Sequence, residues 1–340
     1  MKSKTVYELN RIQRYMMQMR PVLYKQVLFS DGTADYRQPP EPKEWEEVTI
    51  RFRTKKDNVD AVFLCGNGQE YQMKKVETCE EFDYYAYTVT MTDQPFDYYF
   101  QVADGMLTLY YDHYGPTKEL RPQYSFRIVP GFSTPDWAKG AVMYQILVDR
   151  FYNGDMENDV ETNEYFYIRT PSQKIENWDK APSNFSVAEF YGGDLEGVRK
   201  KLDYLQNLGI EVIYFNPLFV SPSNHKYDIQ DYDYIDPHYG KIVADGGELL
   251  APGCVDNRLA QRYIQRVTDK RNLEASNQFF AELVEEIHSR GMKVILDGVF
   301  NHCGSFNKWM DREELYNGQE GYEPGAYVSG ESPYRGYFKF

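Results

Sequence analysis

Residues 293–304 read KVILDGVFNHCG, and this segment is the starting point for interpreting the chain. Its first half holds three consecutive aliphatic residues at 294–296, a pattern typical of a strand buried on both faces of a parallel sheet. Its second half places Asp297, Asn301 and His302 where such a strand would end. Functional side chains of parallel α/β sheets and barrels lie at the carboxyl ends of strands. Such residues are also common turn formers, so a functional edge and an ordinary turn remain equal alternatives on this segment alone.

The same segment resembles the Asp-x-x-x-Asn-His signature of the α-amylase family of glycoside hydrolases. Two upstream segments, NHKYDIQDY at 224–232 and QILVDRFYNGD at 145–155, lie in the right order. Both resemble the branch of that family formed by neopullulanases, cyclomaltodextrinases and maltogenic amylases. The resemblance extends from about Trp137 to residue 340.

Composition limits the classes of function before any motif is considered. The 340 residues include 42% hydrophobic residues, enough for about two domains with sizeable cores. A formal net charge of -14 argues against binding to nucleic acid or to an anionic membrane surface, because both require clustered Lys and Arg. The 31 tyrosines favour carbohydrate binding weakly, since aromatic rings stack on sugars but more often fill cores.

The first 20 residues carry positive charge without an apolar run of signal-peptide length, and no transmembrane segment follows. Four cysteines are present without C-x-x-C spacing, which predicts free thiols and a cytoplasmic protein. A bridge between Cys65 and Cys79 across two strands is the less favoured alternative.

Residues 1–133 are predicted to contain an all-β sandwich. From Glu47 onward apolar and polar residues alternate, as in a half-buried strand, and turn signals occur at 67–68 and 104–105. The further predicted strands are Val59–Leu64, Tyr84–Met91, Phe96–Val102, Leu107–Tyr110 and Ser125–Val129. Short, evenly spaced strands of this kind indicate a sandwich. It resembles the starch-binding-like N-terminal module of the neopullulanase branch, which implies a homodimer formed through this domain.

Residues 134–340 are predicted to form the first three βα units of a (β/α)8 TIM barrel and the long loop after strand three. The boundary lies in the Pro- and Gly-rich segment 130–135. The predicted strands are Val142–Val148, Val212–Phe215 and Lys293–Val299, and the predicted helices are Leu195–Leu208 and Glu274–Arg290, ending at Gly209 and Gly291. This strand–helix alternation is typical of a barrel. Residues 241–271 are predicted to form a loop and a short helix.

The segment 153–159, NGDMEND, is rich in side chains that supply oxygen ligands. Such loops suit Ca²⁺, which takes six to eight oxygens, although by themselves they are more often sets of turn formers. The resemblance to the neopullulanase branch favours calcium. It implies as ligands Asn153, Asp155, Asn158, Asp159, the carbonyl of Gly192, and Asp194.

The resemblance also implies roles for the residues of a sugar subsite. Tyr227 is expected to stack on the sugar ring, and His225 and His302 are expected to hydrogen-bond its hydroxyl groups. Asp297 matches a supporting acidic residue near the nucleophile, and Asn301 is interpreted as structural. A solvated loop residue is the alternative reading of His225.

One departure from the family bears directly on activity. Retaining glycosidases need two carboxyl groups about 5–5.5 Å apart, one as nucleophile and one as acid and base. The family carries the nucleophile in a Gly-x-Arg-x-Asp segment, and the printed sequence contains none after His302.

Two hypotheses about function follow. The first is a retaining glycoside hydrolase acting on α-1,4 bonds of maltodextrins, cyclodextrins or pullulan, of which this chain is an N-terminal portion that is inactive alone. The alternative is a non-catalytic carbohydrate-binding or interaction protein built on a partial amylase fold.

Overall fold

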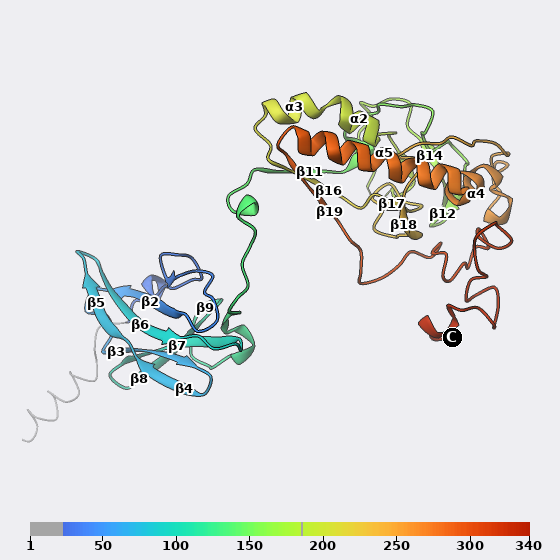
Figure 1. The fold of residues 1–340 in the computed structure, drawn as a ribbon. Helices are drawn as coiled ribbons and strands as arrows, with labels where there is room; N and C mark the ends of the chain where they lie inside the picture. The colour runs from blue at the N-terminus through green and yellow to red at the C-terminus, as the bar shows by residue number, and fades with distance from the viewer. Residues whose placement is uncertain (1–22, 185) are drawn as a thin grey trace, which may run out of the picture. The chain divides into compact units, whose positions relative to one another are not determined.

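The computed structural model describes residues 23–184 and 186–340, in which two compact units divide after Asp136 (Figure 1). The expectation about the first 20 residues lies outside this described part. Each unit is considered by itself below.

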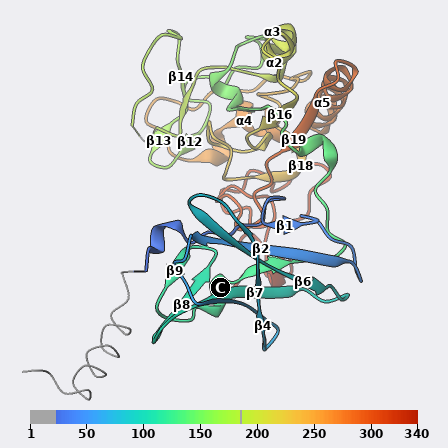
Figure 2. The ribbon, with the colours of Figure 1, turned by 90° about the vertical axis from the view of Figure 1, so that its left-hand side faces the viewer.

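The N-terminal unit is a sandwich of two antiparallel sheets. One sheet has the order β1-β2-β6-β5, and the other has the order β4-β3-β7-β8-β9, with β10 paired to β7 (Figure 2). The strands of the first sheet are β1 (Arg37–Gln38), β2 (Glu47–Lys55), β5 (Lys74–Thr78) and β6 (Phe82–Thr90). Those of the second are β3 (Ala61–Gly66), β4 (Gln69–Gln72), β7 (Phe96–Asp104), β8 (Leu107–Asp112), β9 (Gly115–Thr117) and β10 (Phe126–Ile128).

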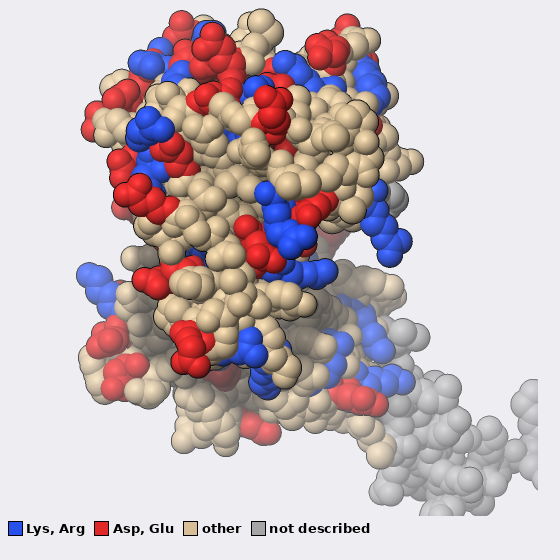
Figure 3. All heavy atoms as spheres, turned by 90° about the vertical axis from the view of Figure 1, so that its right-hand side faces the viewer, with Lys and Arg blue, Asp and Glu red and all other residues tan. Residues whose placement is uncertain are grey.

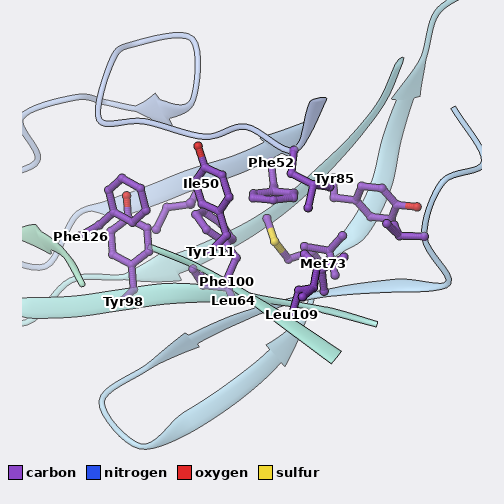
Figure 4. Packing of buried hydrophobic residues seen from close by; sticks show 14 of the residues in the cluster. Ile50, Phe52, Leu64, Met73, Tyr85, Tyr98, Phe100, Leu109, Tyr111 and Phe126 are labelled. Carbon is purple, nitrogen blue, oxygen red and sulfur yellow. The ribbon is translucent and has the colours of Figure 1, made fainter. Parts of the chain in front are cut away.

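Alternation along β2 and β7 creates the core between the two sheets. Every second residue of β2 is buried, among them Ile50 and Phe52, and Tyr98 and Phe100 of β7 are buried in the same way. The rings of Phe52 and Phe100 lie 4.7 Å apart, and Figure 4 shows them at the centre of the cluster. Cross-sheet aromatic contacts of this kind add to the free energy gained by burying apolar area.

The predicted strands of this unit correspond to β2, β3, β6, β7, β8 and β10, with boundaries that differ by at most two residues. Asn67 and Gly68 have positive φ and form the turn between β3 and β4, as predicted. The second predicted turn, at 104–105, lies one residue too early. Asp104 still pairs with Leu107, so the loop is Gly105–Met106. The sequence did not predict β1, β4, β5 and β9, which have little apolar alternation.

The second unit is organised around a parallel sheet of three strands, β11 (Met143–Ile146), β16 (Val212–Phe215) and β19 (Lys293–Leu296), in that order. Helices α2 (Leu195–Lys200), α3 (Leu202–Asn207) and α5 (Lys270–Ser289) lie over one face (Figure 1). Ile146, Ile213 and Phe215 pack into a core with α2, α3 and α5. A parallel pair needs a crossover connection, and the helices supply it.

The helix signals in the sequence are largely confirmed. A single predicted helix at 195–208 is two helices, because the chain departs from helical geometry at Lys201. Gly209 and Gly291 both have positive φ directly after the helices, as their C-terminal positions require. Helix α5 begins four residues earlier than predicted because the side chain of Asp269 caps its N-terminus. The short helix expected in 241–271 is α4 (Gln261–Thr268).

The aliphatic runs of the outer strands are typical of burial on both faces, but three strands cannot close a barrel, and the outer strands are partly exposed. In the described sheet β11 and β19 each pair only with the central strand β16. Val142 is 52% exposed and Leu296 is 43% exposed, whereas Val212 and Ile213 of β16 are fully buried. Burial on both faces requires cover on the face opposite the helices, and among the described residues that cover is incomplete.

Shorter elements complete the second unit. Three two-stranded pairs join β12 (Phe166–Tyr167) to β13 (Thr170–Pro171), β14 (Gln173–Lys174) to β15 (Glu189–Phe190), and β17 (Phe219–Val220) to β18 (Asp231–Ile235). The single 3-10 turns of this unit occupy Val148–Arg150, Asn257–Leu259 and Arg335–Tyr337. The 3-10 turns Lys25–Val27 and Pro122–Tyr124 belong to the N-terminal unit, and Asp136–Ala138 spans the boundary. The three strand pairs lie in the connections between the parallel strands β11, β16 and β19.

The four cysteines are free thiols, so the alternative bridge between Cys65 and Cys79 does not form. Within the described ranges, no helix combines the length and apolar character needed to span a bilayer.

We predict that limited proteolysis of the 340-residue chain leaves a resistant fragment ending near Pro130–Pro135. The sandwich has its own core, whereas β11 and β19 present open edges with exposed apolar side chains that favour digestion or association. Mass spectrometry of the fragments checks the result. A protease-resistant segment 137–340 in a monodisperse monomer would contradict it.

Candidate active site at the carboxyl ends of the parallel strands

The carboxyl ends of β16 and β19 bring polar side chains to one edge of the sheet. Phe215 and Leu296 are register partners, so the residues after them emerge together. The backbone N–H of Asp297 donates to the carbonyl of Phe215 at 3.1 Å, which continues the ladder to Asp297. After β16, Asn216 accepts a hydrogen bond from Gln145 of β11 at 2.7 Å. Asp297 therefore lies at a fixed position on a polar edge.

Tyr227 reaches Asp297 from a loop 70 residues earlier in the chain. Its hydroxyl donates to the Asp297 carboxylate at 2.6 Å. This hydrogen bond to a charged acceptor, with burial second, raises the pKa of Tyr227 to about 12. The phenol therefore stays protonated at neutral pH and holds one oxygen of Asp297.

His225 lies beside Tyr227, with ring centroids 5.9 Å apart. Its Nδ1 accepts the backbone N–H of Tyr227 at 3.1 Å, so the ring proton lies on Nε2. Burial lowers the pKa of His225, which keeps the ring neutral. Its Nε2–H is thus the ring atom suited to donate to a hydroxyl group.

His302 is exposed and also contacts Tyr227. Its Nε2 donates to the backbone carbonyl of Tyr227 at 3.1 Å, and its Nδ1 lies 3.4 Å from the amide nitrogen of Asn301. The structure thus brings together Asp297, Tyr227, His225 and His302, the four residues that the sequence placed at a sugar subsite. Their roles there stay predictions.

Three further residues take part in this cluster and were missed by sequence reasoning. Tyr214 on β16 has its pKa raised by burial and by the adjacent Asp297. Ser223 contacts His225 Nδ1 at 3.2 Å, and Tyr232 donates to the carbonyl of His302 at 2.8 Å. Tyr214 had a signal in the sequence as a polar position inside a buried strand, and Tyr232 had one as the last residue of the segment 224–232.

The loop 153–159 lies next to Asp194, the N-cap of α2. The Asp194 carboxylate accepts the backbone N–H groups of Gly154, Asp155 and Gly197. Burial raises the pKa of Asp194 to about 6 despite these bonds. Asp194 therefore fixes the loop to the first turn of the helix.

Two observations test whether this loop suits calcium. The Oδ1 atoms of Asn153 and Asn158 are buried and have no hydrogen-bond partner. Gly192 has φ +78°, and a Cβ atom there would collide with Asp159 and Asn153. Buried amide oxygens without a partner, in a loop that also carries carboxylates, are ligands of the kind that a hard cation takes, and the crowding at Gly192 leaves no room there for a side chain.

Two lysines occupy the same neighbourhood. Lys174 pairs with Asp159 at 2.9 Å, and Lys241 pairs with Asp155 at 3.1 Å. Among the residues that the structure describes, no group of three or more His, Cys, Asp or Glu could hold a metal ion. The fit therefore rests on the asparagine amide oxygens together with carboxylates that lysines also neutralise.

Five buried side chains of alternating charge form a chain that ends at Lys226, the residue between His225 and Tyr227. Arg266 donates to Glu164 at 3.0 Å, and His238 bonds Glu164 and Asp236 at 2.8 Å each. Lys226 completes the chain by donating to Asp236 at 2.7 Å. All five side chains are at least 97% buried. Because carboxylates only accept, both ring nitrogens of His238 carry protons.

Each of the two units matches a known family of protein domains. Residues 145–250 and 275–339 match the alpha amylase catalytic domain, and residues 42–129 match the alpha amylase N-terminal Ig-like domain. The chain belongs to the α-amylase family. The predicted fold class, a β-sandwich followed by part of a (β/α)8 barrel, is therefore confirmed.

Characterised relatives in the α-amylase family are enzymes. The chain is 31% identical over 315 residues to a cyclomaltodextrinase of Thermoanaerobacter pseudethanolicus, covering 88% of this chain and 45% of the relative. It is 32% identical over 286 residues to the intracellular maltogenic amylase of Bacillus subtilis, covering 78% and 40% respectively. The type III pullulan hydrolase from Thermococcus kodakarensis is similar in structure, with 27% identity, a TM-score of 0.47, and coverage of 92% of this chain and 46% of that one. The chain thus spans less than half the length of these relatives.

A pH prediction follows from His238. Burial lowers its pKa, but the carboxylates of Glu164 and Asp236 outweigh this and place it above the ordinary value. The stabilisation is full below pH about 6.5, the unfolded value, and is lost as the pH rises through the raised folded pKa. In protein expressed from the complete reading frame, the free energy of unfolding lost in His238→Gln should therefore shrink at alkaline pH. Urea unfolding of both proteins between pH 6 and 10 checks this, and a constant difference would contradict it.

Proposed function

We propose that the protein hydrolyses α-1,4-glucosidic bonds of maltodextrins, cyclodextrins or pullulan by a retaining mechanism. The observation that carries the proposal is the cluster of His225, Tyr227, Asp297 and His302, joined by hydrogen bonds of 2.6–3.1 Å at the carboxyl edge of the sheet. The relatives, a cyclomaltodextrinase and a maltogenic amylase, support the same class of substrate.

In this proposal each residue of the cluster has one role at the sugar. The ring of Tyr227 stacks on the sugar face while its hydroxyl stays on Asp297. His225 donates from Nε2 to a sugar hydroxyl, and His302 binds a second hydroxyl. Hydrogen bonds that tighten as the ring flattens towards an oxocarbenium ion raise the rate as well as the affinity. Asp297 supports the charge of the site and is not the nucleophile.

The partners and compartment proposed are those of a sugar-metabolising enzyme in the cytoplasm. Acidic and basic side chains are interspersed on the face drawn in Figure 3, and the net charge is -14, which supports α-glucans over nucleic acid or membrane lipid. A homodimer through the N-terminal unit is proposed from the resemblance of that unit alone. Sedimentation velocity at several concentrations tests it.

The 340-residue chain by itself is predicted to release no reducing sugar from maltodextrin. It contains no Gly-x-Arg-x-Asp segment, and a positioned nucleophile and acid cannot be replaced by binding residues. The measurement is a reducing-sugar assay against a heat-killed control. Activity above that control would refute this prediction and the assignment of Asp297 as a supporting residue.

Protein expressed from the complete reading frame should be active, and His302→Ala should lower kcat/KM by roughly 10- to 100-fold, the worth of one transition-state hydrogen bond. The matched control is His288→Ala, since His288 is an exposed histidine of α5. An inactive wild type that still binds maltotriose would favour the non-catalytic carbohydrate-binding alternative. A His302→Ala variant as active as the control would remove His302 from the site.

We further propose that Ca²⁺ binds at Asn153, Asp155, Asn158, Asp159, the carbonyl of Gly192, and Asp194. The unpaired oxygens of Asn153 and Asn158 support this proposal. The ion would supply no chemistry at the sugar. It would hold the loop after β11 against α2, while Lys174 and Lys241 give up their carboxylates.

Calcium at 100 times its Kd should stabilise the complete protein by about 2.7 kcal/mol, because only the folded state binds it. Chelator should lower the melting temperature of the wild type and not that of an Asp155→Ala and Asp194→Ala double variant. Asp194 also caps a helix, so the control is Asp269→Ala, which removes the cap of α5 and should keep the calcium response. A wild-type melting curve unaffected by chelator would rule out the site.

A further inference from the structure

Lys226 lies between the two predicted sugar-binding residues, and its side chain points away from them into the interior. Its side chain is 1% exposed, whereas His225 and Tyr227 are only partly buried. Its backbone has φ +57°, a left-handed conformation that residues with a Cβ adopt at a cost and that glycine adopts freely. A lysine at such a position needs surrounding contacts that hold the strained backbone.

Those contacts are made by the ammonium group and by the Lys226 backbone. Nζ donates to the Asp236 carboxylate at 2.7 Å and to the carbonyl of Ser221 at 3.1 Å, and it lies 4.5 Å from the centre of the Tyr239 ring. The backbone N–H donates to the hydroxyl of Ser223 at 3.1 Å. The ammonium thus ties the centre of the turn to both its own loop and the segment after β18.

Asp236 is itself held rigidly. It accepts the backbone N–H of Ser221 at 3.1 Å and that of His238 at 2.9 Å, and it bonds the ring of His238 at 2.8 Å. Glu164 and Arg266 continue the buried charges beyond His238. The anchor of Lys226 is therefore a fixed group and not a surface carboxylate that could follow the loop.

The left-handed turn has a direct consequence for the neighbouring residues. It lets the backbone N–H of Tyr227 reach Nδ1 of His225, and it aims the carbonyl of Tyr227 at His302. In the same geometry the hydroxyl of Tyr227 meets Asp297. If Lys226 were extended, His225 and Tyr227 would instead follow the straight path of a strand. The N–H groups of that strand would then point towards neighbouring strands.

We propose that Lys226 is a positioning residue for the sugar subsite: its buried pair with Asp236 holds the left-handed turn that sets His225 and Tyr227 towards the substrate. This inference rests on the proposed function for the identity of the ligand. The inference that Lys226 holds the left-handed turn depends only on the contacts of Lys226 and not on the identity of the ligand. A purely structural ion pair is the competing reading, and it predicts lower stability with an unchanged subsite.

The test compares Lys226→Gly and Lys226→Met with Lys308→Met in protein expressed from the complete reading frame. The substitution by glycine removes both the ammonium group and the strain of the left-handed backbone. The substitution by methionine keeps an apolar side chain of similar length and removes the charge. Lys308 is the matched control, because it too is a largely buried lysine, paired with Asp231 and Asp233. Affinity for maltotriose is measured by calorimetry, kcat and KM on maltodextrin by a reducing-sugar assay, and the folded fraction by thermal melting.

The expected result is at least a tenfold fall in maltotriose affinity and in kcat/KM per folded molecule for Lys226→Met, and a smaller fall for Lys226→Gly, because glycine adopts the left-handed conformation without the anchor. Lys308→Met should lose melting temperature but bind maltotriose within twofold of the wild type. If Lys226→Met binds within twofold of the wild type, the positioning role is overturned. Equal losses in the Lys308 control would show general destabilisation and would also overturn it.

A crystal structure of each variant separates this inference from the proposed function. If the wild type binds no maltotriose, the proposed function fails, and the distance from the Tyr227 hydroxyl to Asp297 still decides the positioning role. Loss of that 2.6 Å contact in Lys226→Met supports it, and an unchanged contact refutes it. Asp236→Asn replaces Lys226→Met if the latter does not fold. It keeps the shape and weakens the anchor, with the same outcomes.

Discussion

The parallel pairing of β16 with β11 on one side and β19 on the other is the constraint on which the second unit depends. It aligns the ends of three strands that are distant in the sequence and leaves the helices to cover one face. Loops that leave the aligned ends meet above the same edge. The hydrogen bond from Tyr227 to Asp297 therefore joins segments 70 residues apart in the sequence.

Behind that edge, charge takes the place of apolar packing. Arg266, Glu164, His238, Asp236 and Lys226 alternate in sign and are almost wholly buried. Each group loses its hydration, and the loss is offset only because every neighbour carries the opposite charge and a hydrogen bond. Such a chain tolerates little displacement, since moving one member leaves another charge buried and unpaired. The charged chain gives the backbone at Lys226 a fixed support, which a non-directional apolar core would not give.

Local features of the fold were readable from the sequence because they depend on short-range physics. Alternation along Glu47–Lys55 indicated β2, and Gly209 and Gly291 marked helix ends. The misses have equally physical causes. Strands β4 and β5 have mostly exposed side chains, so hydrophobic periodicity carries no signal for them. The aliphatic run at 294–296 suits a fully covered strand, but whether it is covered depends on neighbours that no local pattern reports.

The sequence by itself determined the family signatures and the identities of the candidate site residues, because chemistry at a sugar or a cation needs particular side chains at particular spacings. Only the tertiary structure decided which atoms of those residues are used. It assigned the His225 proton to Nε2, paired Lys174 with Asp159, and left the Asn153 oxygen unpaired. It also decided that the side chain of Lys226, which lies inside a signature, faces the interior and pairs with Asp236. These outcomes depend on long-range contacts and on burial, and both are fixed only when segments far apart in the chain pack together.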